Sequence, residues 1–493
     1  TTALGPVCVA TAAKTADRWD VEVIDENNYK RYGPRTGEGL TDHRTLQKMR
    51  PADVVGLYGG LTSTVPRLYE IAKEYKAMGV TTVAGGQHFA GDNIAEALSS
   101  GVDIVVIGEG EEVIKELLAL IAAGGDKSAV PGIAFLKDGN VVVTSARAPI
   151  TDFDSAPLPD FSLVRYAKIK VYPINWVRGC GMNCEFCTVK GKPRPATPER
   201  VFRQITDLVE KHHARRFFLV DDLFGQFRSE AISLCKLLAE YQDAVGIRLE
   251  ITVQIRLDKA KDTELLTAMR RAGIATVCIG FESPIEEQLK AMEKHLRPED
   301  MVALARIYSK AGFFVHGMFI FGYPLAPGVE FRMPLDEQVK RFKKFIKQAR
   351  LDTVQVLLPV PFAGTELTER LRKENRLFPL DVIGWEYYDG NFPVFEPDQP
   401  NTPEQLHVAG KKIMGRFYSF KYMFDVGFRT LLFPYMVFYL HNIRKGWQKW
   451  HKPWWNSVIR FGGWVTIRRW TNEFKKGGFL NKLKLAEQRI RSG

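Results

Sequence analysis

Short apolar runs alternate with amphipathic segments over residues 1–125. Four apolar runs have the length of buried strands and lie at residues 21–24, 53–57, 80–84 and 103–107. Three further segments have the spacing of helices and lie at residues 65–78, 93–99 and 111–123. Because strands that alternate with helices form parallel sheets covered on both faces, residues 1–125 predict a doubly wound α/β domain.

A connector follows at residues 126–170. The apolar runs at 129–135 and 140–144 predict a hairpin, because Lys137-Asp138-Gly139 between them is a turn sequence. Residues 152–160 contain two prolines and predict an extended linker between domains.

Strands and helices alternate again over residues 171–370. Six apolar runs predict strands at residues 171–177, 216–221, 248–254, 276–282, 314–321 and 353–359. Six strand–helix units predict a partial (β/α)6 barrel that is open on one side. Functional groups of such barrels lie at the carboxyl ends of the strands.

The last region, residues 371–493, predicts mainly helices. Its most apolar window, residues 417–440, is interrupted by Lys421, Asp425 and Arg429, whose four-residue spacing places them on one helical face. Pro434 is expected to bend or end this helix. A spanning helix needs about 20 mainly apolar residues, so we interpret this segment as interfacial and not as transmembrane.

Charge is concentrated in the same region. The 493-residue chain has a formal charge of +12, and residues 411–493 alone carry 18 Lys and Arg against 3 Asp and Glu. Six tryptophans are interleaved with these bases: Trp447, Trp450, Trp454, Trp455, Trp464 and Trp470. Aromatic and basic side chains favour an anionic membrane surface. The alternatives are an ordinary helical subdomain and, least favoured, nucleic-acid contact.

Three of the six cysteines are closely spaced, as Cys180-x3-Cys184-x2-Cys187 after a predicted strand. The other three are scattered, so no disulfide framework is expected and a reducing compartment is favoured. The chain does not open on a signal-like segment, and we expect a cytoplasmic protein at the membrane periphery. A structural zinc site usually has four protein ligands, whereas three thiolates suit a 4Fe-4S cluster with one open iron.

With Phe186 just before the last cysteine, this motif resembles that of the radical S-adenosylmethionine (radical SAM) superfamily. The resemblance implies that Cys180, Cys184 and Cys187 hold the cluster and that S-adenosylmethionine chelates the fourth iron. It also implies an electron donor of flavodoxin or ferredoxin type, and a 5'-deoxyadenosyl radical that abstracts hydrogen from an unactivated carbon. A structural metal site and chance spacing of thiols are the alternatives.

Residues at the predicted strand ends extend the resemblance. Asp221 and Asp222 follow the second strand, where family members contact the methionine ammonium, although either could equally cap the next helix. Arg256 ends the third strand and could hold the methionine carboxylate in a two-pronged contact. Glu282 and Ser283 end the fourth strand, at the segment that contacts the ribose in the family.

Glycine-rich sequences end the strands of the first domain. Gly59-Gly60-Leu61-Thr62, Gly85-Gly86 and Gly108-Glu109 allow a backbone to approach a flat ligand closely. In this order they resemble the Rossmann-like cobalamin-binding domain that precedes the barrel in one branch of the superfamily. The D-x-H-x-x-G element that supplies a histidine to cobalt is absent, so cobalamin is expected without a protein histidine ligand. We expect His88 to have a structural or hydrogen-bonding role.

These resemblances imply cobalamin-dependent methylation of an unactivated carbon, and the expected membrane surface of residues 411–493 favours an apolar, lipid-like substrate. One alternative is radical C–C coupling, cyclisation or rearrangement of a lipid without cobalamin. A catalytically inactive scaffold that binds lipid or a partner is the other. The sequence does not specify the substrate, the carbon attacked or the oligomeric state.

Overall fold

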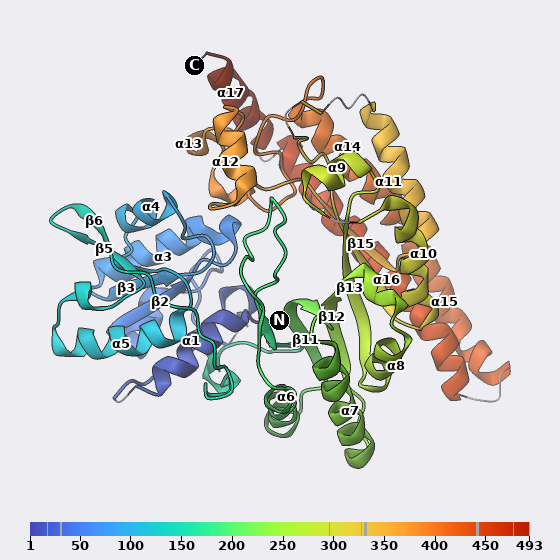
Figure 1. Ribbon diagram of the computed structural model, residues 1–493, viewed down its shortest axis with the longest axis horizontal. Coiled ribbons are helices and arrows are strands. Elements are labelled where there is room, and N and C mark those ends of the chain that lie inside the picture. Colours follow the sequence, from blue (N-terminus) through green and yellow to red (C-terminus); the bar gives the residue numbers. More distant parts are fainter. Residues whose placement is uncertain are drawn as a thin grey trace.

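The computed structural model describes residues 1–16, 18–29, 32–294, 296–326, 328–329, 333–439, 443–476 and 478–492. Figure 1 shows an α/β region in blue and cyan, a larger α/β region in green and yellow, and a helical region in orange and red. The fold therefore has the three regions that the sequence predicts.

The amino-terminal region contains a five-stranded sheet of order β2-β3-β4-β5-β6. Strands β2 (Val54–Tyr58), β3 (Thr81–Gly85) and β4 (Ile104–Val106) are parallel. Its helices are α1 (Leu4–Lys14), α2 (His43–Met49), α3 (Val65–Ala77), α4 (Asn93–Ser99) and α5 (Gly110–Ala123). The predicted doubly wound domain is confirmed.

Two details of this sheet differ from the expectation. The hairpin β5 (Ile133–Lys137) and β6 (Asn140–Val143) is not a free connector, because β5 pairs antiparallel with β4 and extends the sheet. The run at 21–24 contributes only β1 (Val23–Ile24), which pairs with β7 (Val164–Arg165) outside the main sheet. Val83, Ile104 and Val105 are buried, as expected for β3 and β4, which lie inside the sheet and have helices packed on them.

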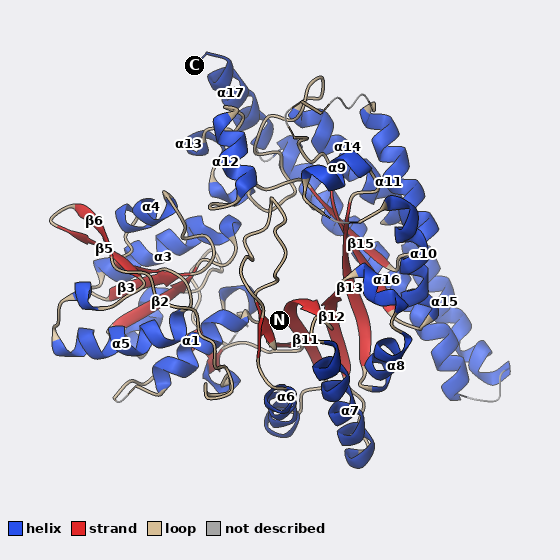
Figure 2. Cartoon of the chain, in the orientation of Figure 1, coloured by secondary structure: helices blue, strands red, loops and turns tan. Residues whose placement is uncertain are grey.

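The second region is a parallel sheet of six strands. They are β8 (Tyr172–Ile174), β11 (Arg216–Phe224), β12 (Glu250–Ile255), β13 (Ile274–Glu282), β14 (Phe314–Ile320) and β15 (Thr353–Leu357), neighbours in that order. Helices α6 (Pro198–His212), α7 (Arg228–Val245), α8 (Thr263–Arg271), α9 (Glu286–Ala291), α10 (Pro298–Lys310) and α11 (Leu335–Ala349) connect them. Figure 2 shows the strands in red with helices along one side. The predicted partial barrel is confirmed.

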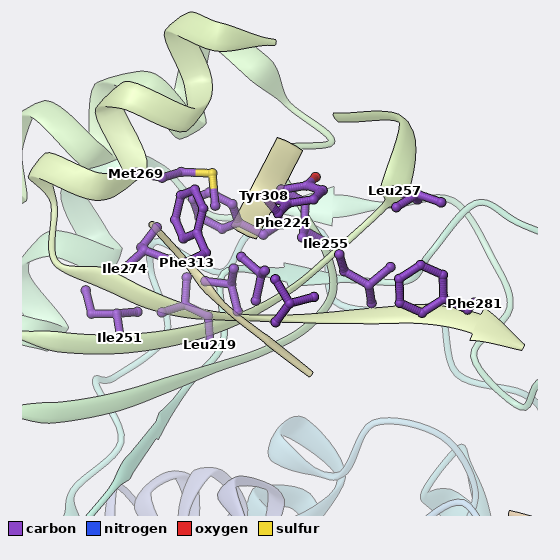
Figure 3. Close-up of a cluster of buried hydrophobic side chains, with 14 of the residues drawn as sticks. Leu219, Phe224, Ile251, Ile255, Leu257, Met269, Ile274, Phe281, Tyr308 and Phe313 are labelled. Carbon is purple, nitrogen blue, oxygen red and sulfur yellow. The ribbon is translucent and has the colours of Figure 1, made fainter. Parts of the chain in front are cut away.

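Alternating strand residues fill the core between this sheet and its helices. Leu219, Ile251 and Ile274 come from three neighbouring strands, and Figure 3 shows them beside Met269 of α8 and Phe313. The predicted strand at 171–177 is divided in two. Its second part, β9 (Val177–Arg178), leaves the sheet and pairs antiparallel with β10 (Arg194–Pro195), so that residues 179–193 between them form a loop.

The carboxyl-terminal region is helical. It contains α12 (Glu366–Lys373), α13 (Leu380–Ile383), α14 (Pro403–Phe417), α15 (Lys421–Tyr439), α16 (Ile443–Lys476) and α17 (Phe479–Ser492). Short 3-10 turns occur along the chain at Glu26–Asn28, Thr62–Thr64, Lys127–Ala129, Phe161–Leu163, Leu257–Lys261 and Trp385–Tyr387. Thr402 caps α14 through a capping box, as its sequence suggests.

Helices α15 and α16 pack on each other and form the outer edge of the molecule beyond the barrel (Figure 1). Pro434 does not end α15, which continues to Tyr439. Among the described residues, we find no helix of the length and apolarity needed to cross a membrane. Leu440, the last residue of the apolar window, lies outside the described residues, as does the side chain of Trp447.

Candidate active site

Residues 179–193, which we call the cluster loop, carry all three motif cysteines. Gly179, Gly181 and Gly191 have positive φ angles of 86°, 72° and 95°, which an L side chain adopts only with strain. At Gly179 a Cβ would also lie 2.8 Å from the carbonyl oxygen of Lys192. Glycine at these positions therefore allows the loop to fold back on itself.

The three thiols lie close together and are shielded from water. Cys184 is buried and the other two are partly buried. Burial raises the pKa of each thiol, and the charges of Cys180 and Cys184 also raise that of Cys187. Partly buried thiols that repel one another when ionised fit a cationic metal group, which removes both costs.

No three His, Cys, Asp or Glu side chains in the described part of the chain converge tightly enough for a single metal ion. A four-iron cluster is larger than one ion, so thiols that bind three of its corners lie farther apart. A set of three thiol donors fits a 4Fe-4S cluster with one open iron, whereas a structural zinc site usually has four protein ligands.

Two of the residues predicted to bind S-adenosylmethionine face the cluster loop. Asp222 lies close enough to Cys180 and Cys187 for its charge to raise their pKa values. Arg256 has its Nη1 3.3 Å from the sulfur of Met182, and its charge lowers the pKa of Cys180. A carboxylate and a guanidinium thus stand on the loop's barrel side, where an amino acid group could pair with both.

Glu282 also lies at this site, but with a partner that the sequence did not indicate. Lys294 donates to its Oε1 at 2.7 Å, and the ammonium is near enough to Cys180 and Cys184 to lower their pKa values. Glu282 has a φ of 59°, in the left-handed region. The sequence carries no motif at Lys294, which follows a short helix and reaches the site only through the fold.

Asp221, Ser283 and Phe186 have other surroundings. Asp221 is buried and accepts hydrogen bonds from the backbone N–H of Trp176 at 2.7 Å and from Asn175 at 2.8 Å. Ser283 is buried and donates to Gln288 at 2.6 Å. The ring of Phe186 packs edge-to-face on Tyr323, with centroids 6.0 Å apart. The contacts of Asp221, Ser283 and Phe186 are thus with other side chains and backbone groups of the protein.

The glycine-rich ends of strands β2 and β3 in the amino-terminal sheet lie very close to each other. The N–H of Gly59 donates to the carbonyl of Gly85, and Gly86 has a φ of 128°. A Cβ on Gly86 would lie 2.7 Å from the carbonyl carbon of Gly59. Beside Gly60, the side chains of Tyr58 and Leu61 are 46% and 65% exposed. This edge offers apolar surface that a flat cofactor can cover.

Thr62 and His88 lie deeper in the same edge. The Nδ1 of His88 is 3.3 Å from the Thr62 hydroxyl, and its ring meets Trp385 edge-to-face at 4.9 Å. Burial lowers the pKa of His88 to about 4. Trp385 also donates to Glu96 at 2.8 Å, so the segment after the barrel is docked on this domain.

Gly108 and Glu109 end the third strand of this edge. Gly108 has a φ of 91° and open space around it. Glu109 instead joins the two domains, because it accepts from Arg178 at 3.2 Å and from Arg194 at 2.9 Å. These arginines lie in β9 and β10, on either side of the cluster loop.

The two candidate cofactor edges meet at one direct contact. The hydroxyl of Thr188, which follows Cys187, donates to the side-chain oxygen of Gln87 at 3.1 Å. Gln87 follows Gly86 at the end of β3. The cluster loop therefore touches the strand end at which the sequence predicts cobalamin, and Figure 1 shows this loop between the two domains.

Sequence models of two families match the chain. That of the radical SAM superfamily matches residues 174–335, and that of the B12 binding domain matches residues 1–118. The first range includes all three motif cysteines, and the second includes the glycine-rich strand ends.

Several relatives are similar over much of the chain. An uncharacterized methyltransferase, PH0819, of Pyrococcus horikoshii is 27% identical over 83% of this chain and 86% of its own length. The anaerobic magnesium-protoporphyrin IX monomethyl ester cyclase of Rubrivivax gelatinosus is 27% identical over 70% of this chain and 63% of its own. The hopanoid C-2 methylase of Rhodopseudomonas palustris is 30% identical over 48% and 44%.

The fold also matches a solved structure. The radical S-adenosylmethionine methyltransferase TsrM of Kitasatospora setae, solved with cobalamin and a [4Fe-4S] cluster, aligns with a TM-score of 0.59 at 18% identity. The alignment covers 76% of each chain.

Proposed function

Because the chain is a radical SAM enzyme that carries an amino-terminal cobalamin-binding domain, we propose that it methylates an unactivated carbon of an apolar, lipid-like substrate. The contact between Gln87 and Thr188 is the observation that carries the proposal. It brings the strand end predicted for the corrinoid against the loop predicted for the cluster. A substrate carbon at this junction is within reach of both groups.

The residues of the site have separate roles in this proposal. When bound, the cluster supplies an electron to S-adenosylmethionine and the corrinoid supplies a methyl group. Cys180, Cys184 and Cys187 bind iron, Asp222 orients the methionine ammonium and Arg256 holds its carboxylate. The glycine-rich edge admits the corrinoid. The electron comes from a flavodoxin or ferredoxin.

Anaerobic purification and reconstitution tests methylation. We expect corrinoid absorption, about four irons per chain, and both S-adenosylhomocysteine and 5'-deoxyadenosine as products. The Cys184→Ala variant should lose cluster absorption and both products while it retains the corrinoid. A chain that binds no corrinoid and forms 5'-deoxyadenosine alone would instead support cyclisation or rearrangement, the chemistry that the similarity to the cyclase favours.

The names of two relatives support an apolar substrate, since one acts on a hopanoid and the other on a protoporphyrin ester. Incubation with a lipid extract and methyl-deuterated S-adenosylmethionine tests this. We expect a deuterated methyl group in the organic-soluble fraction, absent with Cys184→Ala. Label that appears only in water-soluble products would contradict a lipid-like substrate.

An exposed apolar face on α15 supports access from a membrane. Phe424, Phe428 and Leu431 are 66%, 62% and 80% exposed and lie three or four residues apart, so they share one face. Asp425 of α15 contacts the neighbouring helix instead: it pairs with Arg429 at 3.0 Å and accepts a hydrogen bond from Ser457 of α16. Phe420 and Met423 extend the exposed face.

We propose that this face docks on an anionic lipid bilayer. Charge complementarity favours lipid, because residues 411–493 have a balance of +15 whereas the rest of the chain sums to −3. Contiguous exposed aromatic and aliphatic side chains suit the boundary between headgroups and acyl chains.

Flotation with vesicles of phosphatidylglycerol and phosphatidylcholine tests the docking. We expect Phe424→Ser/Phe428→Ser/Leu431→Ser to float at least tenfold less, and Val141→Ser/Val143→Ser/Val245→Ser, which removes exposed aliphatic residues elsewhere, to float like the parent. Equal flotation of both variants would contradict this site. Binding only to neutral vesicles would contradict the electrostatic argument.

A further inference from the structure

Glu185 lies inside the cysteine motif and is held by a residue far along the chain. It follows Cys184 directly, and its carboxylate accepts from Arg370 of α12 at both oxygens, from Nε at 2.6 Å and from Nη2 at 3.0 Å. Tyr323, at the end of β14, donates to the same carboxylate at 2.5 Å. The carboxylate of Glu185 therefore accepts three hydrogen bonds from two side chains.

The position of Arg370 is fixed in turn. Its Nη1 donates to the carbonyl of Leu325 at 3.0 Å, and its Nη2 donates to that of Pro324 at 3.1 Å. The side chains of Glu185 and Arg370 are only 11% and 15% exposed. A planar guanidinium with this many partners has one orientation, and water screens the pair weakly.

A second contact ties the cluster loop to the same helix. Lys190 donates to Glu366 at 2.9 Å and to the carbonyl of Cys184 at 2.9 Å. Glu366 and Arg370 are four residues apart, so they lie on one face of α12. The N–H of Leu367 also donates to the carbonyl of Glu185 at 3.3 Å. Helix α12 thus contacts the loop through Glu366, Leu367 and Arg370.

The charge of the Glu185–Arg370 pair affects the cluster because Glu185 is next to the cluster ligand Cys184. An unpaired carboxylate one residue from a cluster ligand, in a poorly solvated site, opposes the addition of an electron to the cluster. Net charge and hydrogen bonding near an iron–sulfur cluster set its reduction potential. Arg370 cancels the charge of Glu185, so this pair adds no net charge beside the cysteines.

We propose that Arg370 is a positioning residue that fixes the cluster loop on α12 and, by neutralising Glu185, keeps the cluster reducible. This inference depends on the cluster assigned above and is independent of the substrate and of methylation. It gives α12, which lies beyond the last barrel strand, a role in the first step of the reaction.

Redox titration of the reconstituted chain, followed by electron paramagnetic resonance, tests the inference through opposite shifts. We expect Arg370→Gln to lower the ratio of reduced to oxidised cluster at a fixed potential about tenfold, which is ~59 mV for one electron. Glu185→Gln leaves an uncompensated guanidinium and should raise this ratio. The Glu185→Gln/Arg370→Gln double variant should return close to the parent.

The matched control is Arg372→Gln on the same helix, because Arg372 is 53% exposed and pairs with Glu369 at 2.7 Å, away from the loop. Its cluster should titrate like that of the parent. Shifts of the same sign in both single variants, or no shift with full iron content, would overturn the electrostatic role.

A variant that fails to load iron is still informative. Hydrogen exchange of residues 180–190 in the full-length apo chain should be faster in Arg370→Gln than in Arg372→Gln, and Arg370→Lys should restore part of the protection. Unchanged exchange in Arg370→Gln would overturn the positioning role. Absence of methylation by the parent chain, with the expected shifts in the Arg370→Gln and Glu185→Gln variants, would count against the proposed function alone.

Discussion

At the scale of single residues, burial determines the chemistry of His88. Its ring lies under Trp385, is 3% exposed, and burial lowers its pKa to about 4 from 6.5 in a solvated chain. In the unfolded chain His88 therefore binds a proton below pH 6.5, whereas in the folded chain it binds one only below about pH 4. The contribution of neutral, buried His88 to the free energy of unfolding is fully present above pH 6.5 and falls as the pH drops from 6.5 to about 4.

We predict that His88→Gln weakens the pH dependence of stability between pH 6.5 and 4. The pKa difference corresponds to at most about 3 kcal/mol. Thermal unfolding of the apo chain, followed by circular dichroism at several pH values, measures it. Thr62→Val, which removes the hydroxyl partner and keeps the imidazole, should retain the parent's slope. An equal slope in His88→Gln would show that the ring is not buried as described. His407, whose burial lowers its pKa to about 3, contributes to the dependence that remains.

The neighbouring acids Asp221 and Asp222 show what the sequence can determine at this scale. Both lie in β11, and the motif predicted contact with S-adenosylmethionine for either. The structure separates them, because Asp221 is used by Trp176 and Asn175 while Asp222 faces the cysteines. Neighbouring residues of a strand point to opposite faces, and Asp221 lies on the same face as the buried Phe217 and Leu219. Which of the two faces is buried depends on tertiary packing, which the motif spacing does not encode.

At the scale of elements, periodicity predicted nearly every strand of the two sheets, because central parallel strands are continuous apolar runs. The hairpin β5–β6 was predicted as a hairpin but not as part of the sheet, since edge pairing leaves no local signal. Lys294, Tyr323 and Arg370 were missed as site residues for the same reason. Their partners are distant in sequence, and each looks like an ordinary loop or helix residue.

Close packing of two strand ends leads to a prediction for Gly86. We expect Gly86→Ala to destabilise the chain by about 1–3 kcal/mol from backbone strain at a φ of 128°, and further because the added Cβ would lie 2.7 Å from Gly59. Urea unfolding measures this. Gly56→Ala, where a Cβ meets nothing within 4 Å, should be neutral or slightly stabilising. Equal effects of the two substitutions would contradict the close approach.

At the scale of the whole molecule, ion pairs join the cobalamin-binding domain to the barrel at the base of the cluster loop. Glu109 contacts both Arg178 and Arg194, and Glu111 contacts Arg178 as well. These side chains are 15–25% exposed. Their arrangement couples the two cofactor edges more firmly than surface pairs would.

We predict that Glu109→Gln lowers the free energy of unfolding by about 1–3 kcal/mol. The loss is smaller than for a fully buried pair because Arg178 keeps its ion pair with Glu111. Thermal unfolding and proteolysis of the linker at residues 144–160 measure the loss. Glu112→Gln, which removes an acid that is 47% exposed and pairs with Lys115 of the same helix, should change neither. A parent-like melting curve for Glu109→Gln would show that the domains are held by apolar contacts alone.

The distance along the chain between Glu185 and Arg370 has a consequence for biosynthesis. The two are separated by 185 positions, so a ribosome exposes the cysteines long before it makes the helix that steadies them. A nascent chain paused after the barrel would present a loose, oxygen-accessible set of sulfurs. Stable metal binding by this loop should therefore follow the synthesis of α12, and nascent chains that stop before α12 should hold less iron than chains that include it.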